Sequence, residues 1–217
     1  MKIQVVKKVL NANNTIAEQN RKLFAEKKVF VINIMSSPGS GKTKVLEKTL
    51  ELIKHKIKSA VIVGDVCTTN DADRLSKTGV KVIQVNTDEF GGDCHLAAHV
   101  IQKAASDMDL DAIDFLIIEN VGNLVCPAEF DIGENARAVV LSTTEGEDKP
   151  LKYPLMFRVC DVALLNKIDL LPYLEFDKNT AIKNIQQIKP DMPIFEVSAM
   201  SGLGLEKWIK WIEDQIS

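Results

Sequence analysis

Residues 36–43 read Ser-Ser-Pro-Gly-Ser-Gly-Lys-Thr and combine the residue types that bind phosphate groups. The P-loop pattern is G-x-x-x-x-G-K-S/T, and only its first glycine is missing, because Ser36 takes that place. Glycines let successive backbone N–H groups turn toward an anion, and the following helix would present its positive end. Lys42 would reach the outer phosphates and Thr43 would bind Mg²⁺, whereas the alternative, a plain glycine turn, would require neither. The predicted phosphate-binding residues are Ser37, Pro38, Gly39, Ser40, Gly41, Lys42 and Thr43.

A second motif, Asn166-Lys167-Ile168-Asp169, matches the N-K-x-D pattern of GTPases. The carboxylate of Asp169 can accept two N–H bonds from guanine, whereas adenine presents the wrong donor pattern, so such a site would discriminate strongly. By itself the tetrapeptide is common and could be a chance turn after a strand. Its place downstream of a P-loop, and before a Ser-Ala pair resembling the element that touches guanine from the other side, favours guanine binding. The predicted base-binding residues are Asn166, Lys167, Asp169, Ser198 and Ala199.

Two acidic residues follow apolar runs, at the strand ends where open α/β sheets bind ligands. Asp65 follows the run at residues 60–63, and Glu119 follows the run at residues 115–118. Mg²⁺ on a nucleotide takes one or two carboxylates and keeps several waters. We therefore expect Thr43 and Asp65 to bind Mg²⁺ directly and Glu119 to bind it through water.

Residues 65–74, rich in Thr and Asp, form a candidate switch segment. Within it, Asp71 would orient the attacking water or sense the γ-phosphate. The alternative for Asp71 is the N-cap of a helix that begins at Ala72. Gly122 would sense the γ-phosphate through its N–H. The predicted catalytic residues are Lys42, Asp65, Asp71, Glu119 and Gly122.

The remaining candidates for chemistry are cysteine and histidine residues that lie near the nucleotide motifs in the sequence. Cys126 lies just past Gly122, and Cys94-His95 stands in another loop, right before a predicted helix. Two thiolates and an imidazole suit Zn²⁺, or Ni²⁺ in a square-planar arrangement. His99 lies one helical turn beyond His95 and is a further candidate ligand. The alternative is that the Cys-His pair only begins a capped helix.

Composition excludes several classes of protein. The chain has 217 residues, 46% of them hydrophobic, which suits one large domain, and its net charge of −3 gives no reason to expect nucleic acid or anionic membrane as a partner. The apolar runs are strand-sized, and the first residues lack the layout of a signal peptide. We therefore expect a cytoplasmic protein without disulfides, in which Cys67 and Cys160 are small buried apolar residues.

The elements that must position these residues alternate along the chain. The pattern predicts an α/β P-loop NTPase fold, with a mostly parallel central sheet, helices on both faces and an N-terminal helical arm. We expect residues 1–28 to form the arm, with a bend or break at Asn-Ala-Asn-Asn (11–14), and residues 29–217 to form the GTPase domain. Residues 143–154, with two prolines, predict a loop or hinge. Strands are expected at 29–35, 60–63, 80–85, 115–118, 138–142, 162–165 and 194–197, and helices at 44–54, 71–77, 96–105, 180–188 and 205–216.

Together these motifs resemble the hydrogenase nickel-incorporation GTPases of the HypB type, P-loop GTPases of the SIMIBI class related to the urease-maturation GTPases. The run Glu-Asn-Val-Gly-Asn-Leu-Val-Cys-Pro (119–127), combined with Cys94-His95-Leu96, separates the chain from the urease relatives. The other matching segments are residues 37–43, Gly64-Asp65 with 71–74, 142–148 and 166–169.

The resemblance implies a metallochaperone that uses GTP and Mg²⁺, hydrolyses GTP slowly to GDP and phosphate, and dimerises when GTP binds. Cys94, His95 and Cys126 would bind Ni²⁺ or Zn²⁺ at the dimer interface. The partners implied are a companion zinc-containing hydrogenase maturation protein and the large-subunit precursor of a NiFe-hydrogenase. Some members carry an N-terminal Cys-x-x-Cys-Gly-Cys site or a histidine-rich tail, and this N-terminus has neither. We therefore expect any nickel function to depend on the interface site.

Two alternatives belong to other functional classes, and a third is a related maturation factor. A P-loop small-molecule kinase would prefer ATP, against which the N-K-x-D motif argues. A non-catalytic GTP-gated adaptor would hold a structural zinc with equal strength in its GDP and GTP states. A maturation factor for another nickel enzyme, such as urease, would share the nucleotide chemistry and differ in its client.

Overall fold

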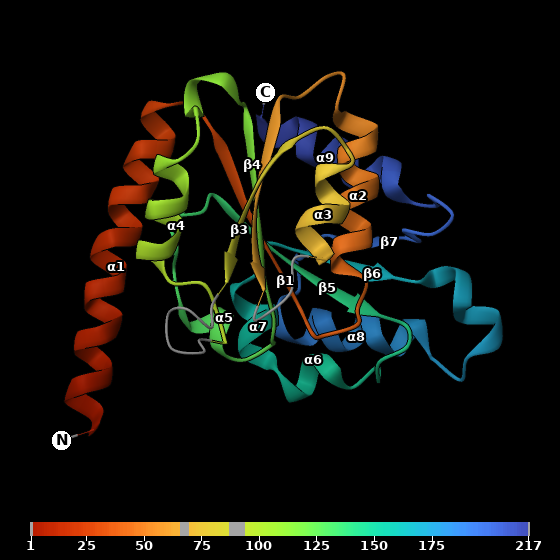
Figure 1. Cartoon of the computed structure of the whole chain (residues 1–217). Coiled ribbons are helices and arrows are strands. Elements are labelled where there is room, and N and C mark those ends of the chain that lie inside the picture. The colour runs from red at the N-terminus through yellow and green to blue at the C-terminus, as the bar shows by residue number, and fades with distance from the viewer. Residues whose placement is uncertain (1, 66–69, 87–93, 217) are drawn as a thin grey trace.

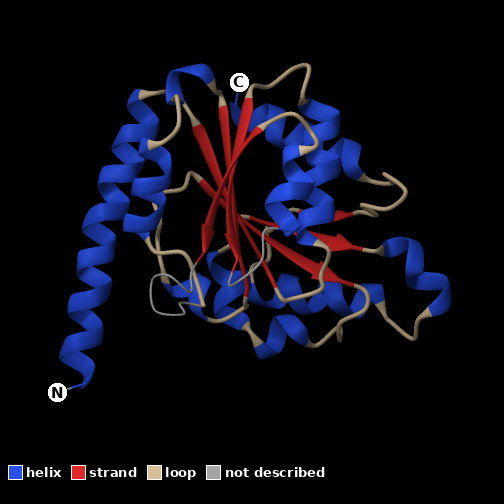
Figure 2. Cartoon of the chain, viewed as in Figure 1, coloured by secondary structure: helices blue, strands red, loops and turns tan. Residues whose placement is uncertain are grey.

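The central element of the computed structural model is a seven-stranded sheet in which all neighbouring strands are parallel (Figures 1 and 2). The structure describes residues 2–65, 70–86 and 94–216, with side chains from residue 9 onward. The strand order is β3-β2-β4-β1-β5-β6-β7, so β1 lies at the centre of the sheet. The strands are β1 (Phe30–Ser36), β2 (Ser59–Asp65), β3 (Lys81–Asn86), β4 (Phe115–Gly122), β5 (Ala136–Ser142), β6 (Val162–Asn166) and β7 (Ile194–Glu196).

Helices cover both faces of the sheet, as predicted, and Figure 1 shows α1 beside α4 on one side and α2, α3 and α9 on the other. The first face also carries α7 and α8 below the β5–β6 half of the sheet. The α-helices are α1 (Lys2–Glu26), α2 (Lys42–Ile53), α3 (Asn70–Ser76), α4 (Ala98–Ser106), α5 (Cys126–Glu129), α6 (Lys149–Lys152), α7 (Pro154–Val159), α8 (Lys178–Ile188) and α9 (Leu205–Ile216), and the 3₁₀ segments are η2 (Leu110–Ala112) and η3 (Ile168–Tyr173).

The central strands are buried on both faces. In β1, Ile32 and Ile34 pack with α2 and α9, whereas Val31 packs with α1 and α4. Because consecutive side chains point to opposite faces, such a strand must be apolar at almost every position. This requirement explains why continuous apolar runs in the sequence marked the strands.

Helix α1 is continuous, so the bend or break expected at residues 11–14 was wrong. Asn13 is buried, where its side chain donates to the carbonyl of Asp131 at 2.7 Å and accepts from the N–H of Ala98 at 2.9 Å. Asn20, about two turns further along the same face of the helix, donates to the carbonyls of Ala98 at 2.8 Å and Ile132 at 3.0 Å. These tertiary hydrogen bonds outweigh the weak helix propensity of asparagine.

Two predicted boundaries were also wrong. Residues 143–154 were expected to be a loop, but α6 and the start of α7 lie there, each with a proline in its first turn, where the missing N–H costs no helical bond. Helix α4 begins at Ala98 and not at Leu96. His95 therefore precedes the helix, and the helical spacing assumed between His95 and His99 does not apply. Across the described ranges, no helix is both long and apolar enough to cross a bilayer.

Candidate nucleotide-binding site and the adjoining cysteine segments

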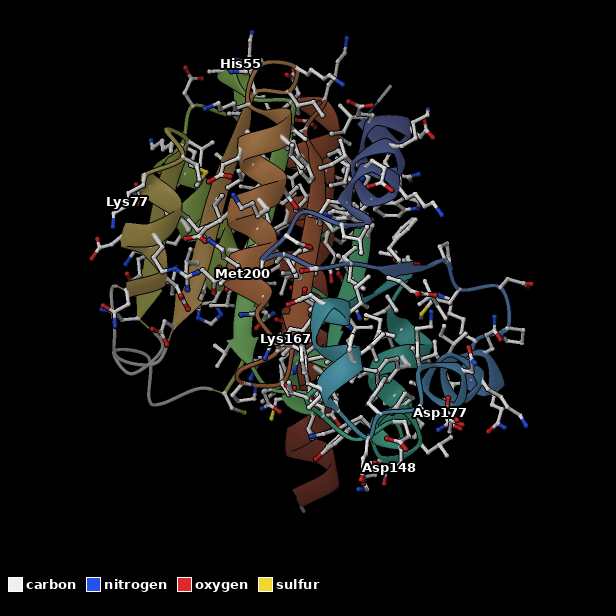
Figure 3. All side chains as sticks on the ribbon, turned by 90° about the vertical axis from the view of Figure 1, so that its right-hand side faces the viewer. His55, Lys77, Asp148, Lys167, Asp177 and Met200 are labelled. Atoms are coloured by element: carbon white, nitrogen blue, oxygen red, sulfur yellow. The ribbon has the colours of Figure 1, made fainter. Side chains whose placement is uncertain are left out.

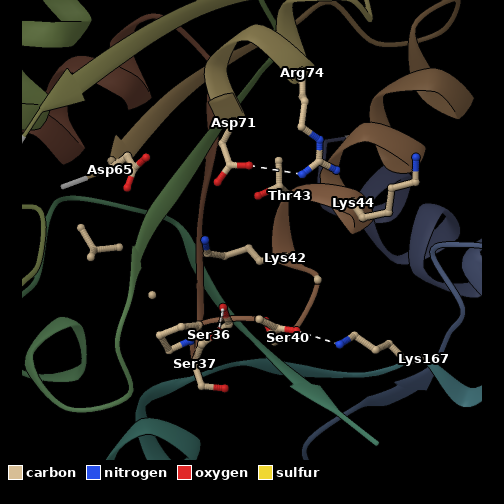
Figure 4. Close-up of a pocket in the computed structure, with 16 residues that line it drawn as sticks. Ser36, Ser37, Ser40, Lys42, Thr43, Lys44, Asp65, Asp71, Arg74 and Lys167 are labelled. Carbon is tan, nitrogen blue, oxygen red and sulfur yellow. Dashed lines mark hydrogen bonds and ion pairs between the residues drawn. The ribbon is translucent and has the colours of Figure 1, made fainter. Parts of the chain in front are cut away.

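A cavity of about 540 Å³ lies at the carboxyl edge of the sheet, where β1 leads into α2 (Figure 4). Residues 36–44 form one wall, and the ends of β2 and β4 with the start of α3 form the other. Because parallel strands all end at this edge, the sheet brings together segments from three parts of the sequence. The predicted site residues that line the cavity are Ser37, Pro38, Gly39, Ser40, Gly41, Lys42, Thr43, Asp65, Asp71, Gly122 and Lys167.

The turn into α2 requires a glycine at position 41. Gly41 has a φ of 87°, a left-handed conformation that residues with a Cβ rarely adopt, and a Cβ there would lie 2.6 Å from Nδ2 of Asn166. Asn166 donates through Nδ2 to the carbonyl of Ser40 at 2.9 Å and accepts the N–H of Ala199 at 3.1 Å. Asn166 thus joins the phosphate loop to the Ser-Ala segment, a role that its motif did not suggest.

Glu119, within β4, contacts the phosphate loop beside the cavity. It is 1% exposed, and its Oε1 accepts from Lys42 Nζ at 2.9 Å and from Thr43 Oγ1 at 2.7 Å. Its other oxygen, Oε2, is buried and has no hydrogen-bond partner among the described residues. A buried carboxylate oxygen beside a threonine hydroxyl matches the oxygen ligands that Mg²⁺ takes, so these residues fit the cation that the P-loop fold implies.

Two other acids line the cavity, on the wall opposite the phosphate loop (Figure 4). Asp65 ends β2, and Asp71 lies within the first turn of α3, which begins at Asn70, so Asp71 does not occupy the N-cap position. Arg74, one turn further, contacts Asp71 at 3.3 Å and donates to both oxygens of Glu47 at 3.0 and 3.1 Å. The hydrogen bonds that Arg74 donates to Glu47 raise the pKa of Arg74 above its usual range. The sequence motifs assign no role to Arg74. Its position three residues after Asp71 on a helix nevertheless predicts the contact between the two side chains.

A smaller cavity of about 330 Å³ adjoins the phosphate loop on the side of η3 and is the candidate base pocket. Asp169 lines this pocket, and its Oδ1 is buried and has no hydrogen-bond partner within the described part of the chain. Lys167 stands above Gly39, whose carbonyl it binds at 2.7 Å, and Figure 3 shows Lys167 and Met200 on the same side of the molecule. Ser198 lies behind the pocket wall and caps the turn after it, with Oγ accepting from Ser201 N at 3.1 Å.

Glu145 is a site residue that the sequence reasoning missed. Its carboxylate accepts from the hydroxyl of Ser37 and from the N–H of Ser142 at 3.1 Å. Glu145 thereby ties the phosphate loop to the segment that follows β5. An acid after an apolar run marks Asp65 and Glu119 as site candidates, and Glu145 carries the same signal after β5.

The end of β4 touches the phosphate loop through Gly122. A Cβ at Gly122 would lie 3.2 Å from the backbone of Pro38, so a larger residue would press on the loop. Val121 and Gly122 both line the phosphate cavity. The segment that leads to Cys126 therefore starts in contact with the place expected for the terminal phosphate.

The predicted metal ligands lie on two segments that a hydrogen bond connects. Asn123 donates through Nδ2 to the carbonyl of Cys94 at 3.2 Å, while the His95 ring stacks on Phe130 with 3.7 Å between the ring centres. Cys94 is exposed, and Cys126 is half-buried at the start of α5.

The described ranges contain no group of three His, Cys, Asp or Glu side chains arranged to hold a metal ion, so one chain does not present these ligands already assembled. His99 is exposed on α4, apart from any such group. Cys160 is buried, as predicted, and burial raises the pKa of its thiol. Cys67 lies outside the described residues.

Comparison with known proteins gives one consistent family. Residues 30–196 match the family described as CobW/HypB/UreG, nucleotide-binding domain. The chain is 52% identical over 207 residues to the hydrogenase maturation factor HypB of Escherichia coli (strain K12), which covers 95% of this chain and 70% of that protein. The crystal structure of HypB from Archaeoglobus fulgidus superposes with a TM-score of 0.89 at 38% identity, covering 96% of this chain and 100% of that one. The crystal structure of HypB from Helicobacter pylori in complex with nickel superposes with a TM-score of 0.88 at 38% identity, covering 94% of this chain and 95% of that one.

Proposed function

Since the chain belongs to the CobW/HypB/UreG family, and within it to the HypB-type hydrogenase maturation factors, we propose that it is a GTP-hydrolysing metallochaperone that carries nickel, or zinc, during maturation of a NiFe-hydrogenase. The main observation behind the proposal is that one short segment, residues 119–126, extends from the phosphate loop to a candidate metal ligand. At its start Glu119 contacts Lys42 and Thr43, and at its end stands Cys126, while Asn123 binds the backbone of Cys94. A nucleotide at one end of this segment can therefore influence metal ligands at the other.

The nucleotide part of the proposal assigns roles to the residues of the phosphate cavity. Lys42 would leave Glu119 to contact the outer phosphates, and Thr43, with Asp65 directly and Glu119 through water, would hold Mg²⁺, which neutralises phosphate charge when bound. Asp71 faces the same cavity and would orient the attacking water. The backbone N–H of Gly122 would contact the γ-phosphate.

The guanine part of the proposal is supported by the orphaned oxygen of Asp169. A buried acceptor without a partner is costly, and the paired N–H groups of guanine would satisfy it. Asn166 and Lys167 would frame the base on one side, with Ser198 and Ala199 on the other. Asp169→Asn tests this role, because an amide presents a donor to guanine. Binding should fall for GTP and improve for xanthosine triphosphate, and unchanged GTP binding would contradict the assignment.

The metal part of the proposal assigns Cys94, His95 and Cys126 as ligands, with His99 as a further candidate. Because the described residues of one chain do not group three such side chains, the proposal includes a GTP-dependent homodimer in which nucleotide binding and the second copy complete the site. The wider partners we propose are a companion zinc-containing maturation protein and the hydrogenase large-subunit precursor. We also propose action in the cytoplasm, with which the thiols of Cys126 and Cys160, neither of them in a disulfide, agree.

A titration of Ni²⁺ and of Zn²⁺ into the protein, once with GDP and once with GTPγS, tests the whole proposal. Oligomeric state is recorded by light scattering at each step. We expect GTPγS to produce dimers and to change metal affinity, and Cys94→Ala or Cys126→Ala to abolish that change. Cys160→Ala, which alters a buried thiol remote from the cavity, is the control. If both ligand variants bind the two metals as the parent does, the metal role is wrong.

A further inference from the structure

On the basis of the proposed function, we propose that Asn120 and Asn123 are positioning residues that transmit the nucleotide state from β4 to the segment carrying Cys94 and His95. Both asparagines lie in the run between Glu119 and Cys126. Neither faces the phosphate cavity. Their side chains instead bind the backbone of the cysteine segment on both sides of His95.

Asn120 occupies the strand position next to the carboxylate of the phosphate cavity. Because consecutive residues of a strand point to opposite faces, Glu119 reaches Lys42 on one face and Asn120 points to the other. Asn120 is 1% exposed, and its Oδ1 accepts the N–H of Leu96 at 3.2 Å. A displacement of Glu119 by nucleotide therefore moves a residue that holds Leu96.

Two more bonds fix the orientation of the Asn120 amide. Its Oδ1 also accepts the N–H of Val121 at 2.9 Å, and its Nδ2 donates to Oδ1 of Asn33 at 3.2 Å. Asn33 in turn donates to the buried Glu134 at 3.2 Å. The amide is thus held on every side by buried groups, so it cannot rotate independently of β4.

Asn123 makes the second connection. Its Nδ2 donates to the carbonyl of Cys94 at 3.2 Å, and its own Oδ1 accepts the N–H of Val125 at 2.8 Å. Gly122, in contact with Pro38, stands between the two asparagines. Movement of Gly122 would therefore displace both asparagines, and with them the hydrogen bonds to Cys94 and Leu96.

The far end of the cysteine segment is held by a different part of the molecule. Ala98 is bound through both its N–H and its carbonyl to Asn13 and Asn20 of α1. The Leu96 side chain packs on Gly64, where a Cβ would lie 2.8 Å from it. Residues 94–98 thus have one end tied to the nucleotide strands and the other to α1. A shift of β4 relative to α1 must reorient Cys94 and His95.

The experiment compares the ratio of Ni²⁺ affinities in the GTPγS and GDP states for the parent, Asn120→Ala, Asn123→Ala and the double variant. Couplings between sites are typically about 5- to 150-fold. We expect the parent ratio in this range and a ratio within about twofold of 1 in the double variant, with GDP affinity changed by less than about threefold. Asn184→Ala is the matched control, because Asn184 is a buried asparagine that donates to a backbone carbonyl, of Glu147, away from these segments. It should keep the parent ratio.

A purely structural role would weaken metal binding equally in both states and leave the ratio unchanged, which would overturn the inference. Asn123 is only half-buried, so its variant provides the test if Asn120→Ala does not fold. If the parent ratio is clear and Asn123→Ala retains it fully, the asparagines do not transmit the nucleotide state, although the proposed function stands. A parent ratio of 1 would refute the proposed coupling itself and this inference with it.

Discussion

Replacing Asn166 by alanine should destabilise the protein by an amount that its two hydrogen bonds determine. The variant would leave the carbonyl of Ser40 and the N–H of Ala199 without their partners, and both residues are buried. An orphaned buried group costs about 1–3 kcal/mol, so the two together cost about 2–6 kcal/mol. Water that enters from the adjoining cavities would favour the lower end, about 2 kcal/mol.

Urea unfolding followed by circular dichroism measures this loss directly, and thermal unfolding checks it. For a chain of 217 residues, 1 kcal/mol lowers Tm by about 2–4 °C, so a fall of about 4–8 °C corresponds to the lower end. Asn184→Ala removes only one such bond, to the carbonyl of Glu147, and should cost about half as much. A loss below about 0.5 kcal/mol for Asn166→Ala would refute the view that this side chain holds the two loops together.

Three further predictions concern other parts of the fold. Gly41→Ala should weaken GDP binding about tenfold or more in a fluorescent-nucleotide titration, because its φ of 87° and the contact with Asn166 both exclude a Cβ; an unchanged affinity would contradict the loop geometry. Trp208→Ala should cost about 3–5 kcal/mol in urea unfolding, because the ring is 1% exposed and its Nε1 donates to a hydroxyl on α2; a cost near 1 kcal/mol would show that α9 repacks. Burial would raise the pKa of Asp131, but the hydrogen bonds from Arg21 at 2.8 Å hold the pKa below its usual range. Their contribution is therefore present above the usual range and lost as pH falls through the lowered pKa, so Arg21→Ala should reduce the free energy of unfolding at about pH 7 and reduce it progressively less as pH falls through that pKa; a reduction that does not change with pH would contradict the ionic origin.

The fold could be predicted because its strongest requirement leaves a pattern in the sequence. Strands buried on both faces need continuous apolar runs, and every expected strand overlaps an observed one. The helices that were missed, α5, α6 and α7, each have proline in their first turn. Proline both interrupts and begins helices, so the local sequence does not distinguish the two cases.

The site was predictable in its motifs and less so in the contacts between them. Lys42, Thr43 and Glu119 meet because parallel strands end at one edge, which topology implies. The bridging role of Asn166 and the link from Asn123 to Cys94 depend on which side chain faces which backbone group. That information arises only from tertiary packing. The same is true of the hydrogen bonds of Asn13 that stabilise the continuous helix α1.

The ion pair between Lys42 and Glu119 has a consequence for ligand entry. Without nucleotide, the ammonium group of Lys42 and the carboxylate of Glu119 neutralise each other. Under the proposed function, Lys42 would turn to phosphate and leave Glu119, which is 1% exposed, without its counter-ion, and an unpaired buried charge is strongly destabilising. Binding of a triphosphate without a divalent cation would therefore carry this free-energy cost, and a cation bound with the triphosphate would remove it. Admission to the cavity should thus be cooperative, with chelators loosening the nucleotide more than the lost cation contacts alone would explain.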